Sequence, residues 1–153
     1  MKLAPLLFLV LLTPAAATEA ITGRASVIDG DTIEIHGKRI RLWGIDAPEG
    51  RQPCTRDGKA WRCGAEAANA LDRHLDGATV ACTVRDIDRY RRVVATCEAR
   101  GRDVGDWLVS EGWALDYRQY SKGAYAAAEA TAKDAGRGVW GGEFEPPWEW
   151  RRR

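Results

Sequence analysis

The sequence has little that would support a metal site or a catalytic centre built on nitrogen and sulfur ligands. It contains only two histidines, His36 and His74, and neither lies at a spacing typical of a metal site or a catalytic triad. Zinc-binding cysteines usually occur in pairs two to four residues apart, whereas Cys54 and Cys63 are much further apart. We therefore expect both histidines at the surface and the cysteines in disulfides.

The sequence also lacks an excess of either charge and a long apolar run. Its 23 basic and 22 acidic residues give a net charge of +1. A nucleic-acid-binding domain is usually basic, so any affinity for phosphate must come from the local placement of arginines. No apolar run approaches the roughly 20 residues of a membrane span. Composition alone leaves the function open.

The first 20 residues predict a secretory signal peptide. Met1 and Lys2 precede an apolar stretch from Leu6 to Leu12, and small residues follow up to Ala17. We expect cleavage after Ala17, with Ala20 as the alternative site, which leaves about 135 residues and one domain. The competing interpretation is an uncleaved anchor or a buried N-terminal helix. The expected product is a secreted or periplasmic monomer, free of the membrane once the signal is removed.

Four cysteines in an exported chain indicate two disulfides, with three possible connectivities. We prefer Cys82 with Cys97, because both fall on runs that are expected to be adjacent strands, and therefore Cys54 with Cys63. Free catalytic thiols are the alternative, but no histidine pattern near the cysteines supports them.

Short runs rich in valine, isoleucine and threonine predict a β-sheet at the start of the mature chain. They cover 22–28, 32–36 and 39–45 and are separated by the turn-forming pairs Asp29-Gly30 and Gly37-Lys38. We expect a three-stranded meander.

The rest of the chain predicts both helices and strands. We expect a long loop over 47–64, a helix over 65–75, a hairpin of strands 79–85 and 92–98, and helices over 104–111 and 125–135. This order is typical of OB-type barrels, whose open face commonly binds oligonucleotides. The predicted fold class is α+β, mainly β: a five-stranded OB-type β-barrel with about three helices.

Three polar segments carry the candidate chemistry. Asp29-Gly30-Asp31-Thr32, taken alone, is an ordinary hairpin turn. In the run from Arg39 to Glu49, strand alternation leaves Arg41 either solvated or directed into a pocket, and Pro48 fixes the backbone between two carboxylates. Asp88-Arg89-Tyr90-Arg91-Arg92, by itself, is a charged hairpin tip.

Together these segments resemble the staphylococcal nuclease (thermonuclease) family over about residues 22–140. The resemblance rests on Asp-Gly-Asp-Thr at 29–32, Arg-Leu-x-Gly-Ile-Asp-x-Pro-Glu at 41–49 and Asp-Arg-Tyr-x-Arg at 88–92. It implies a nuclease-like OB-fold domain over 21–142, between the signal peptide at 1–20 and a Trp/Arg-rich tail at 143–153.

The resemblance also implies an activity and a role for each matching residue. The family activity is Ca²⁺-dependent hydrolysis of DNA and RNA that gives 3′-phosphate ends. It implies that calcium is bound by the carboxylates of Asp31 and Asp46 and the carbonyl of Ala47, and that Glu49 is the general base. The two phosphate-clamping arginines would be Arg41 and Arg92. The implied substrate contacts are Tyr117, Arg89 and Tyr90.

These residue types suit those roles. Ca²⁺ prefers carboxylate and carbonyl oxygens, and an incomplete protein shell leaves places for water and a phosphate oxygen. A neighbouring carboxylate such as Glu49 can deprotonate the attacking water. Arginine offers phosphate two parallel charge-assisted hydrogen bonds and stays protonated.

The sequence departs from the family pattern at three places. Ala47 stands where the staphylococcal enzyme has Thr, which a backbone ligand should tolerate. Arg91 replaces the usual Gly, which either strains a turn that needs a positive φ or adds attraction for phosphate. The loop 51–64 carries two cysteines, and we expect a disulfide there to stiffen it and to alter substrate preference.

The tryptophans and the tail leave alternatives open. We expect Trp107, Trp113 and Trp140 in the core, whereas Trp43 is undecided between packing and base stacking. The tail from Pro146 to Arg153 either docks a tryptophan on the barrel with three arginines free to meet phosphates, or is a disordered basic end.

The sequence predicts an exported Ca²⁺-dependent nuclease. The first alternative is a non-catalytic OB-fold module that binds nucleic acid, and the second is an exported interaction domain that uses its tryptophans. The residues that match the family's catalytic and metal-binding side chains favour the enzyme: Asp31, Arg41, Asp46, Glu49 and Arg92.

Overall fold

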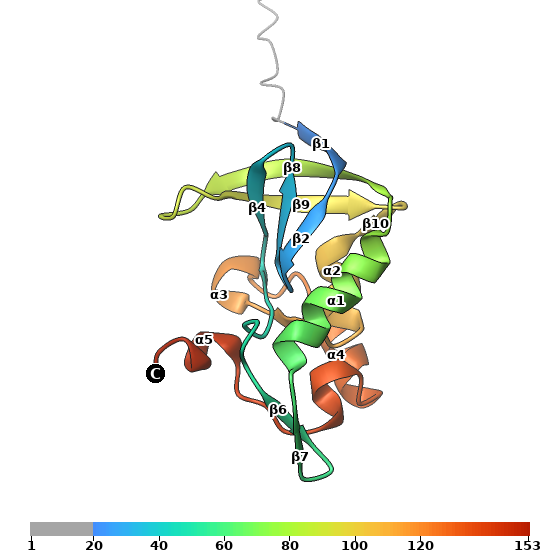
Figure 1. The fold of residues 1–153 in the computed structure, drawn as a ribbon, viewed down its shortest axis with the longest axis vertical. Helices are drawn as coiled ribbons and strands as arrows, with labels where there is room; N and C mark the ends of the chain where they lie inside the picture. Colours follow the sequence, from blue (N-terminus) through green and yellow to red (C-terminus); the bar gives the residue numbers. More distant parts are fainter. Residues whose placement is uncertain (1–19) are drawn as a thin grey trace, which may run out of the picture.

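Seven strands form the main sheet of the protein, which is curled into an OB-type half-barrel (Figure 1). The computed structural model describes residues 20–153. The strands are β1 (Ala20–Arg24), β2 (Ser26–Asp29), β3 (Thr32–Ile35), β4 (Lys38–Leu42), β8 (Thr79–Ile87), β9 (Val93–Ala99) and β10 (Arg102–Asp103). Their order is β1-β8-β9-β4-β3-β2, and β10 pairs with β9. Only the β4–β9 pair of this sheet is parallel.

The predicted meander is present, but two of its strands differ from the prediction. The run 22–28 is interrupted at Ala25, so that β1 pairs with β8 while β2 pairs with β3. The run 39–45 ends at Leu42, because Gly44 turns the chain with a φ of 74°. A separate short strand, β5 (Ile45–Asp46), then pairs with β11 (Leu115–Asp116).

Helices lie along one side of the sheet and below it (Figure 1). They are α1 (Cys63–Leu75), α2 (Val104–Ser110), α3 (Arg118–Ser121), α4 (Ala126–Asp134), the 3₁₀ helix η1 (Gly138–Gly141) and α5 (Pro147–Trp150). The three predicted helices correspond to α1, α2 and α4. The single turns α3 and α5 are too short to leave a periodic apolar pattern in the sequence.

The predicted loop 47–64 contains a hairpin that the prediction missed. Strands β6 (Cys54–Arg56) and β7 (Lys59–Trp61) pair across Asp57-Gly58, and both turn residues have positive φ values of 51° and 74°. An Asp-Gly pair is the usual signal for such a turn, but its flanking strands are too short to show alternation.

Both predicted disulfides are present and pair all four cysteines. Cys82 and Cys97 lie directly opposite each other on β8 and β9, with Cα atoms 4.0 Å apart. Cys54 and Cys63 join β6 to the start of α1, with Cα atoms 5.6 Å apart.

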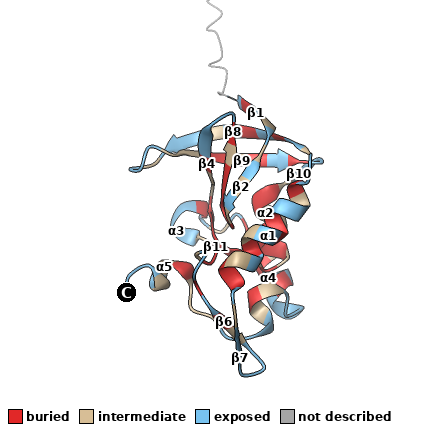
Figure 2. Ribbon diagram, in the orientation of Figure 1, coloured by how far each residue is buried: buried red, intermediate tan, exposed pale blue. Residues whose placement is uncertain are grey.

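Most buried side chains belong to one core between the sheet and α1 and α2, as the burial colours show (Figure 2). Trp107 and Trp113 are partly buried against it, as expected, and Trp140 packs in a smaller cluster with Phe144. His36 is exposed, as predicted. His74 is not a free surface residue, because its ring stacks on Trp107 with centroids 3.7 Å apart.

The expected signal peptide lies outside the described residues, except for Ala20. Within residues 20–153, no helix has the length and apolar character needed to cross a membrane.

Candidate active site

The turn between β2 and β3 directs Asp31 inward. Asp29 ends β2 and accepts a hydrogen bond from the backbone N–H of Asp31 (3.1 Å). Gly30 allows the turn to pack closely, since a Cβ there would lie 2.8 Å from the Cβ of Ala47 and 3.0 Å from that of Ala67 on α1. Asp31 is only 8% exposed. The segment is therefore more than a solvated hairpin turn.

Arg41 brings the carboxylates of Asp31 and Asp46 together. It lies on β4 with its side chain on the face opposite the buried Ile40, as the alternation predicts. One guanidinium nitrogen, Nη1, lies 2.5 Å from Asp31 Oδ2, and the other, Nη2, donates to Asp46 Oδ1 (2.9 Å). Arg41 is directed into the site rather than into solvent, which settles the question its sequence position left open.

Asp46 is the most buried acid of the site. Its side chain has no exposed surface, and its backbone is fixed by pairing with Leu115 across β5 and β11. The next residue, Ala47, donates its backbone N–H to Asp31 Oδ2 (2.9 Å). The backbone thus links the two predicted metal-binding segments directly.

Glu49 is held mainly through its backbone. The fully buried Gln52 accepts from the N–H of Glu49 with its Oε1 (3.2 Å) and donates its own N–H to the Glu49 carbonyl (2.7 Å). Gly64, in the first turn of α1, lies against the same carbonyl so closely that a Cβ would be 1.7 Å from it. The Glu49 side chain is 38% exposed and reaches the site from this fixed backbone.

A residue of the tail completes the cluster. Arg151 makes a two-pronged contact with Asp46, through Nη1 to Oδ1 (2.9 Å) and Nη2 to Oδ2 (2.8 Å). The same Nη1 donates to Glu49 Oε1 (2.7 Å). The tail is therefore docked, and its arginines are not all free to meet phosphates: Arg153 also pairs with Glu145 (2.6 Å).

The second predicted clamp arginine lies at the base of the β8–β9 hairpin tip. Arg92 Nε donates to Asp88 Oδ2 (2.7 Å), and its guanidinium lies 5.5 Å from the centre of the Tyr90 ring. Arg89 and Tyr90 are exposed at the tip. Arg91 has a φ of 64°, so the usual Gly position does keep its left-handed conformation.

One cleft of about 1400 Å³ joins these groups. Its lining includes Asp31, Arg41, Glu49, Arg92, Arg89, Tyr90, Tyr117 and Arg151. Tyr117 follows β11 and stacks on Trp148 of α5, with ring planes 4° apart and centroids at 5.2 Å. Trp43 is partly buried, and Arg85 covers its ring at 4.4 Å, so it is a packing residue at the edge of the cleft.

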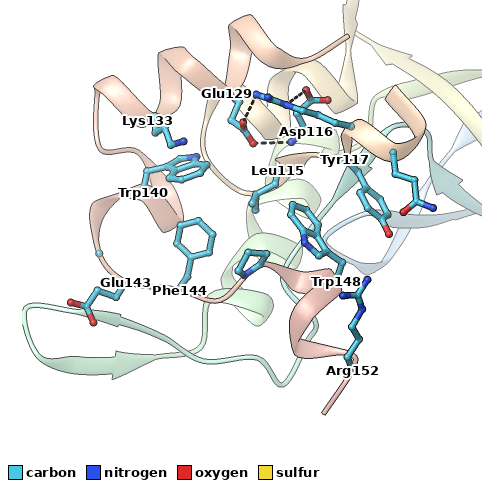
Figure 3. A pocket seen from close by; sticks show the side chains of 14 residues that line it. Leu115, Asp116, Tyr117, Glu129, Lys133, Trp140, Glu143, Phe144, Trp148 and Arg152 are labelled. Carbon is cyan, nitrogen blue, oxygen red and sulfur yellow. Dashed lines mark hydrogen bonds and ion pairs between the residues drawn. The ribbon is translucent and has the colours of Figure 1, made fainter. Parts of the chain in front are cut away.

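A second pocket of about 890 Å³ adjoins the cleft through Tyr117 (Figure 3). Trp148 lines one side of it, and Trp140 and Phe144 line the other. At its rim Glu129 accepts from the backbone N–H of Asp116 (3.1 Å). None of the predicted catalytic side chains lies in this pocket.

Burial and charge separate the acids of the cleft. Burial would raise the pKa of Asp31, but Arg41 and the Ala47 N–H outweigh it and lower that pKa. Burial raises the pKa of Asp46, which Arg151 and Arg41 offset only in part. Burial and the neighbouring charge of Asp31 raise the pKa of Asp29 to about 6. Burial thus disfavours the charged forms of Asp29 and Asp46, whereas a neighbouring positive charge favours the charged form of a carboxylate.

The donors present suit a hard cation such as Ca²⁺. Asp31 and Asp46 are carboxylates close enough for one guanidinium to bridge them, and the Ala47 carbonyl follows directly. Residues 20–153 contain no group of three or more His, Cys, Asp and Glu side chains arranged for a metal. The ligand set would thus be two carboxylates and a carbonyl, with the remaining positions left to water and phosphate.

Sequence reasoning missed two residues of the site, Gln52 and Arg151. Gln52 lies in a loop that carries no motif. Arg151 belongs to a visible run of arginines, but 105 positions separate it from Asp46, and no local pattern pairs residues so far apart.

Comparisons with known proteins show what the sequence is similar to. A family model described as "Staphylococcal nuclease homologue" matches residues 39–142. The succinoglycan biosynthesis protein ExoI of Rhizobium meliloti (strain 1021) is 49% identical over 129 residues, which cover 82% of this chain and 68% of that protein. An uncharacterized endonuclease of Escherichia coli is 33% identical over 99% of this chain and 98% of its own.

A plant relative shares the same region as part of a longer protein. The probable staphylococcal-like nuclease CAN3 of Oryza sativa subsp. japonica is 35% identical over 74% of this chain, which spans 28% of that protein's length. The match to the family model, the identities and the arrangement of the cleft lead to one conclusion: this chain belongs to the staphylococcal nuclease homologue family.

Proposed function

We propose that this protein is an exported, Ca²⁺-dependent nuclease that hydrolyses phosphodiester bonds of DNA and RNA and leaves 3′-phosphate ends. The observation that carries the proposal is the bridge from Arg41 to Asp31 and Asp46, at a cleft lined by Asp31, Arg41 and Glu49. A phosphate placed there meets a guanidinium, a pair of carboxylates suited to a divalent cation, and the carboxylate of Glu49, which Arg151 contacts.

The residues of the cleft divide the reaction between them. Glu49 accepts a proton from water as the water oxygen bonds to phosphorus. Arg41 and Arg92 donate hydrogen bonds to the phosphate oxygens, whose charge grows in the transition state. The bond from phosphorus to the 5′ oxygen breaks, and that oxygen takes a proton from solvent. The products are a 3′-phosphate and a 5′-hydroxyl.

Asp31, Asp46 and the Ala47 carbonyl would hold the cation. When bound, the cation neutralises phosphate charge and makes water more acidic. Contacts with Arg41 and with the Ala47 N–H fix the positions of Asp31 and Asp46 next to each other. An Ala side chain at position 47 does not alter a backbone ligand.

Local charge supports a nucleic acid as substrate despite the neutral composition. The cleft is lined by arginines from β4, the hairpin tip and the tail: Arg39, Arg41, Arg85, Arg89, Arg91, Arg92 and Arg151. The exposed Tyr90 and Tyr120, which also line the cleft, offer ring faces to bases.

The chemistry is tested by identifying the ends of the fragments. Denatured DNA and RNA are cut with Ca²⁺, and the fragments are labelled by polynucleotide kinase with and without prior phosphatase treatment. The proposal predicts 5′ ends that label without phosphatase treatment and 3′ ends that a polymerase extends only after it. Fragments with 5′-phosphates would exclude this mechanism. DNA that is bound but left intact would identify a binding module instead.

Export is supported by the two disulfides, which persist in oxidising compartments. Fractionation of cells that express the full chain tests it. We expect the mature protein in the periplasm or medium with no free thiols, and the proposal of export fails if the protein remains in the cytoplasm with its leader attached.

A further inference from the structure

The C-terminal tail is attached to the domain by specific contacts. The carbonyl of Glu145 accepts from the side chain of the buried Gln52 (2.6 Å). Pro147 is buried at the start of α5, and Trp148 stacks on Tyr117. Arg151, directly after α5, is thereby delivered to the carboxylates of the cleft.

Arg151 occupies the oxygens that a divalent cation would need. It takes both carboxylate oxygens of Asp46, and Oδ1 accepts from Arg41 as well. Its Nη1 also takes Oε1 of Glu49. The Arg151 guanidinium lies 2.9 Å from Asp46 Oδ1 and 2.8 Å from Asp46 Oδ2. A cation that approaches Asp46 would therefore meet a positive charge, and like charges repel strongly where little water screens them.

The arm that carries Arg151, residues 147–151, is held by side-chain contacts and does not pair with the sheet. Helix α5 is a single turn of four residues, and its backbone hydrogen bonds are local. The Arg151 side chain is 38% exposed, unlike that of Arg41, which is 14% exposed and lies on a central strand. Loss of the contacts to Asp46 and Glu49 would leave the sheet and the core unchanged.

We propose that Arg151 is a tail-borne counter-ion of Asp46 and Glu49 that competes with the divalent cation, so that the cation binds only as the arm is released. The inference builds on the cation site of the proposed function. The contact of Arg151 with Asp46 and Glu49 would raise the Ca²⁺ concentration needed to fill the site. The enzyme would then be inactive where calcium is scarce and active where calcium is abundant.

The test is calorimetric titration of Ca²⁺ into the exported, disulfide-closed protein without nucleic acid. Arg151→Gln should bind Ca²⁺ about ten-fold more tightly than wild type, because a positive charge beside the ligands is lost. Arg152→Gln is the matched control, since Arg152 is the next arginine but lines the second pocket. Its affinity should stay within about two-fold of wild type.

A second variant tests the attachment of the arm to the domain rather than the charge of Arg151. Trp148→Ala removes the stack on Tyr117 and keeps Arg151, and it should tighten Ca²⁺ binding by a smaller factor. Equal or weaker Ca²⁺ binding by Arg151→Gln overturns the inference, as does a failure of both wild type and variant to bind Ca²⁺.

The same proteins separate this inference from the proposed function. If Arg151→Gln binds Ca²⁺ more tightly but no variant cleaves nucleic acid, the competition between Arg151 and the cation is supported and the proposed nuclease activity is refuted. Ca²⁺-dependent cleavage by wild type with unchanged affinity in Arg151→Gln would do the reverse.

Discussion

Arg91 shows how a single backbone angle answers a question that the sequence left open. The family has Gly at this position of the hairpin tip, and the tip keeps the conformation that favours Gly, with φ at 64°. A side chain in this region costs about 1 kcal/mol or more, because Cβ crowds the following carbonyl. Arg91 also lines the cleft, so the same residue adds positive charge there.

Replacing Arg91 with Gly should therefore stabilise the protein by about 1 kcal/mol. Urea unfolding measures the change in free energy. Arg89→Gly is the control, because Arg89 lies in the same tip without a positive φ, and it should give no gain. Equal stability of the two variants would show that Arg91 is not strained.

At the scale of elements, the position of Glu49, the proposed general base, depends on how closely α1 approaches the loop after β5. Gly64 lies in the first turn of α1, and its missing side chain is what lets the Glu49 carbonyl come near. Gln52 forms hydrogen bonds with both the N–H and the carbonyl of Glu49. The position of Glu49 is thus set by packing between α1 and the loop, rather than by its own side-chain contacts alone.

Gly64→Ala should displace Glu49 and lower kcat by about 100-fold, because a Cβ would lie 1.7 Å from the Glu49 carbonyl and a shift of about 1 Å in a catalytic group costs roughly this factor. Steady-state nuclease kinetics measure it. Gly50→Ala is the control, since Gly50 has open space around it and no positive φ. A fully active Gly64→Ala variant would contradict the role of this contact.

The contact of His74 on α1 with Trp107 on α2 should make the stability of the protein depend on pH. Burial against Trp107 and the nearby Arg100 and Arg102 lower the pKa of His74 below its ordinary value of 6.5. The folded state therefore favours the neutral ring, and this stability is present above pH 6.5 and is lost as the pH falls through the lowered pKa.

His74→Gln should remove that part of the pH dependence. The free energy of unfolding should decrease more between pH 7 and pH 5 for wild type than for the variant. Other titrating groups contribute equally to the decrease in both proteins. If the free energy of unfolding changed equally with pH in the two proteins, the pKa of His74 would be the same in the folded and unfolded states.

The elements that the sequence predicted well are those with a local pattern. The hairpin of β8 and β9 has clear alternation, and the prediction that Cys82 faces Cys97 is confirmed. The elements it missed are too short for a period to show: β6, β7, β10, β11, α3, η1 and α5. Likewise Asp31, Arg41 and Asp46 could be grouped from motifs, whereas the contact of Arg151 with Asp46 depends on how the whole chain closes.

At the scale of the whole molecule, the fold assembles one cleft from distant parts of the chain. The turn before β3, strand β4, the loop after β5, the β8–β9 tip and the tail all contribute charged side chains. One disulfide joins β8 to β9, and the other fixes β6 to the start of α1. The near-neutral chain can therefore present a concentrated set of arginines and acids without a basic surface overall.

The most direct test of this account is the release of acid-soluble nucleotides from denatured DNA by the exported protein, with Ca²⁺ and with chelator. Wild type should cleave only with Ca²⁺, and Glu49→Gln should be slower by about 100-fold or more, because the water loses its base. Glu143→Gln, which changes an exposed acid outside the cleft, should match wild type. Cleavage that persists in chelator, or a fully active Glu49→Gln variant, would contradict the account.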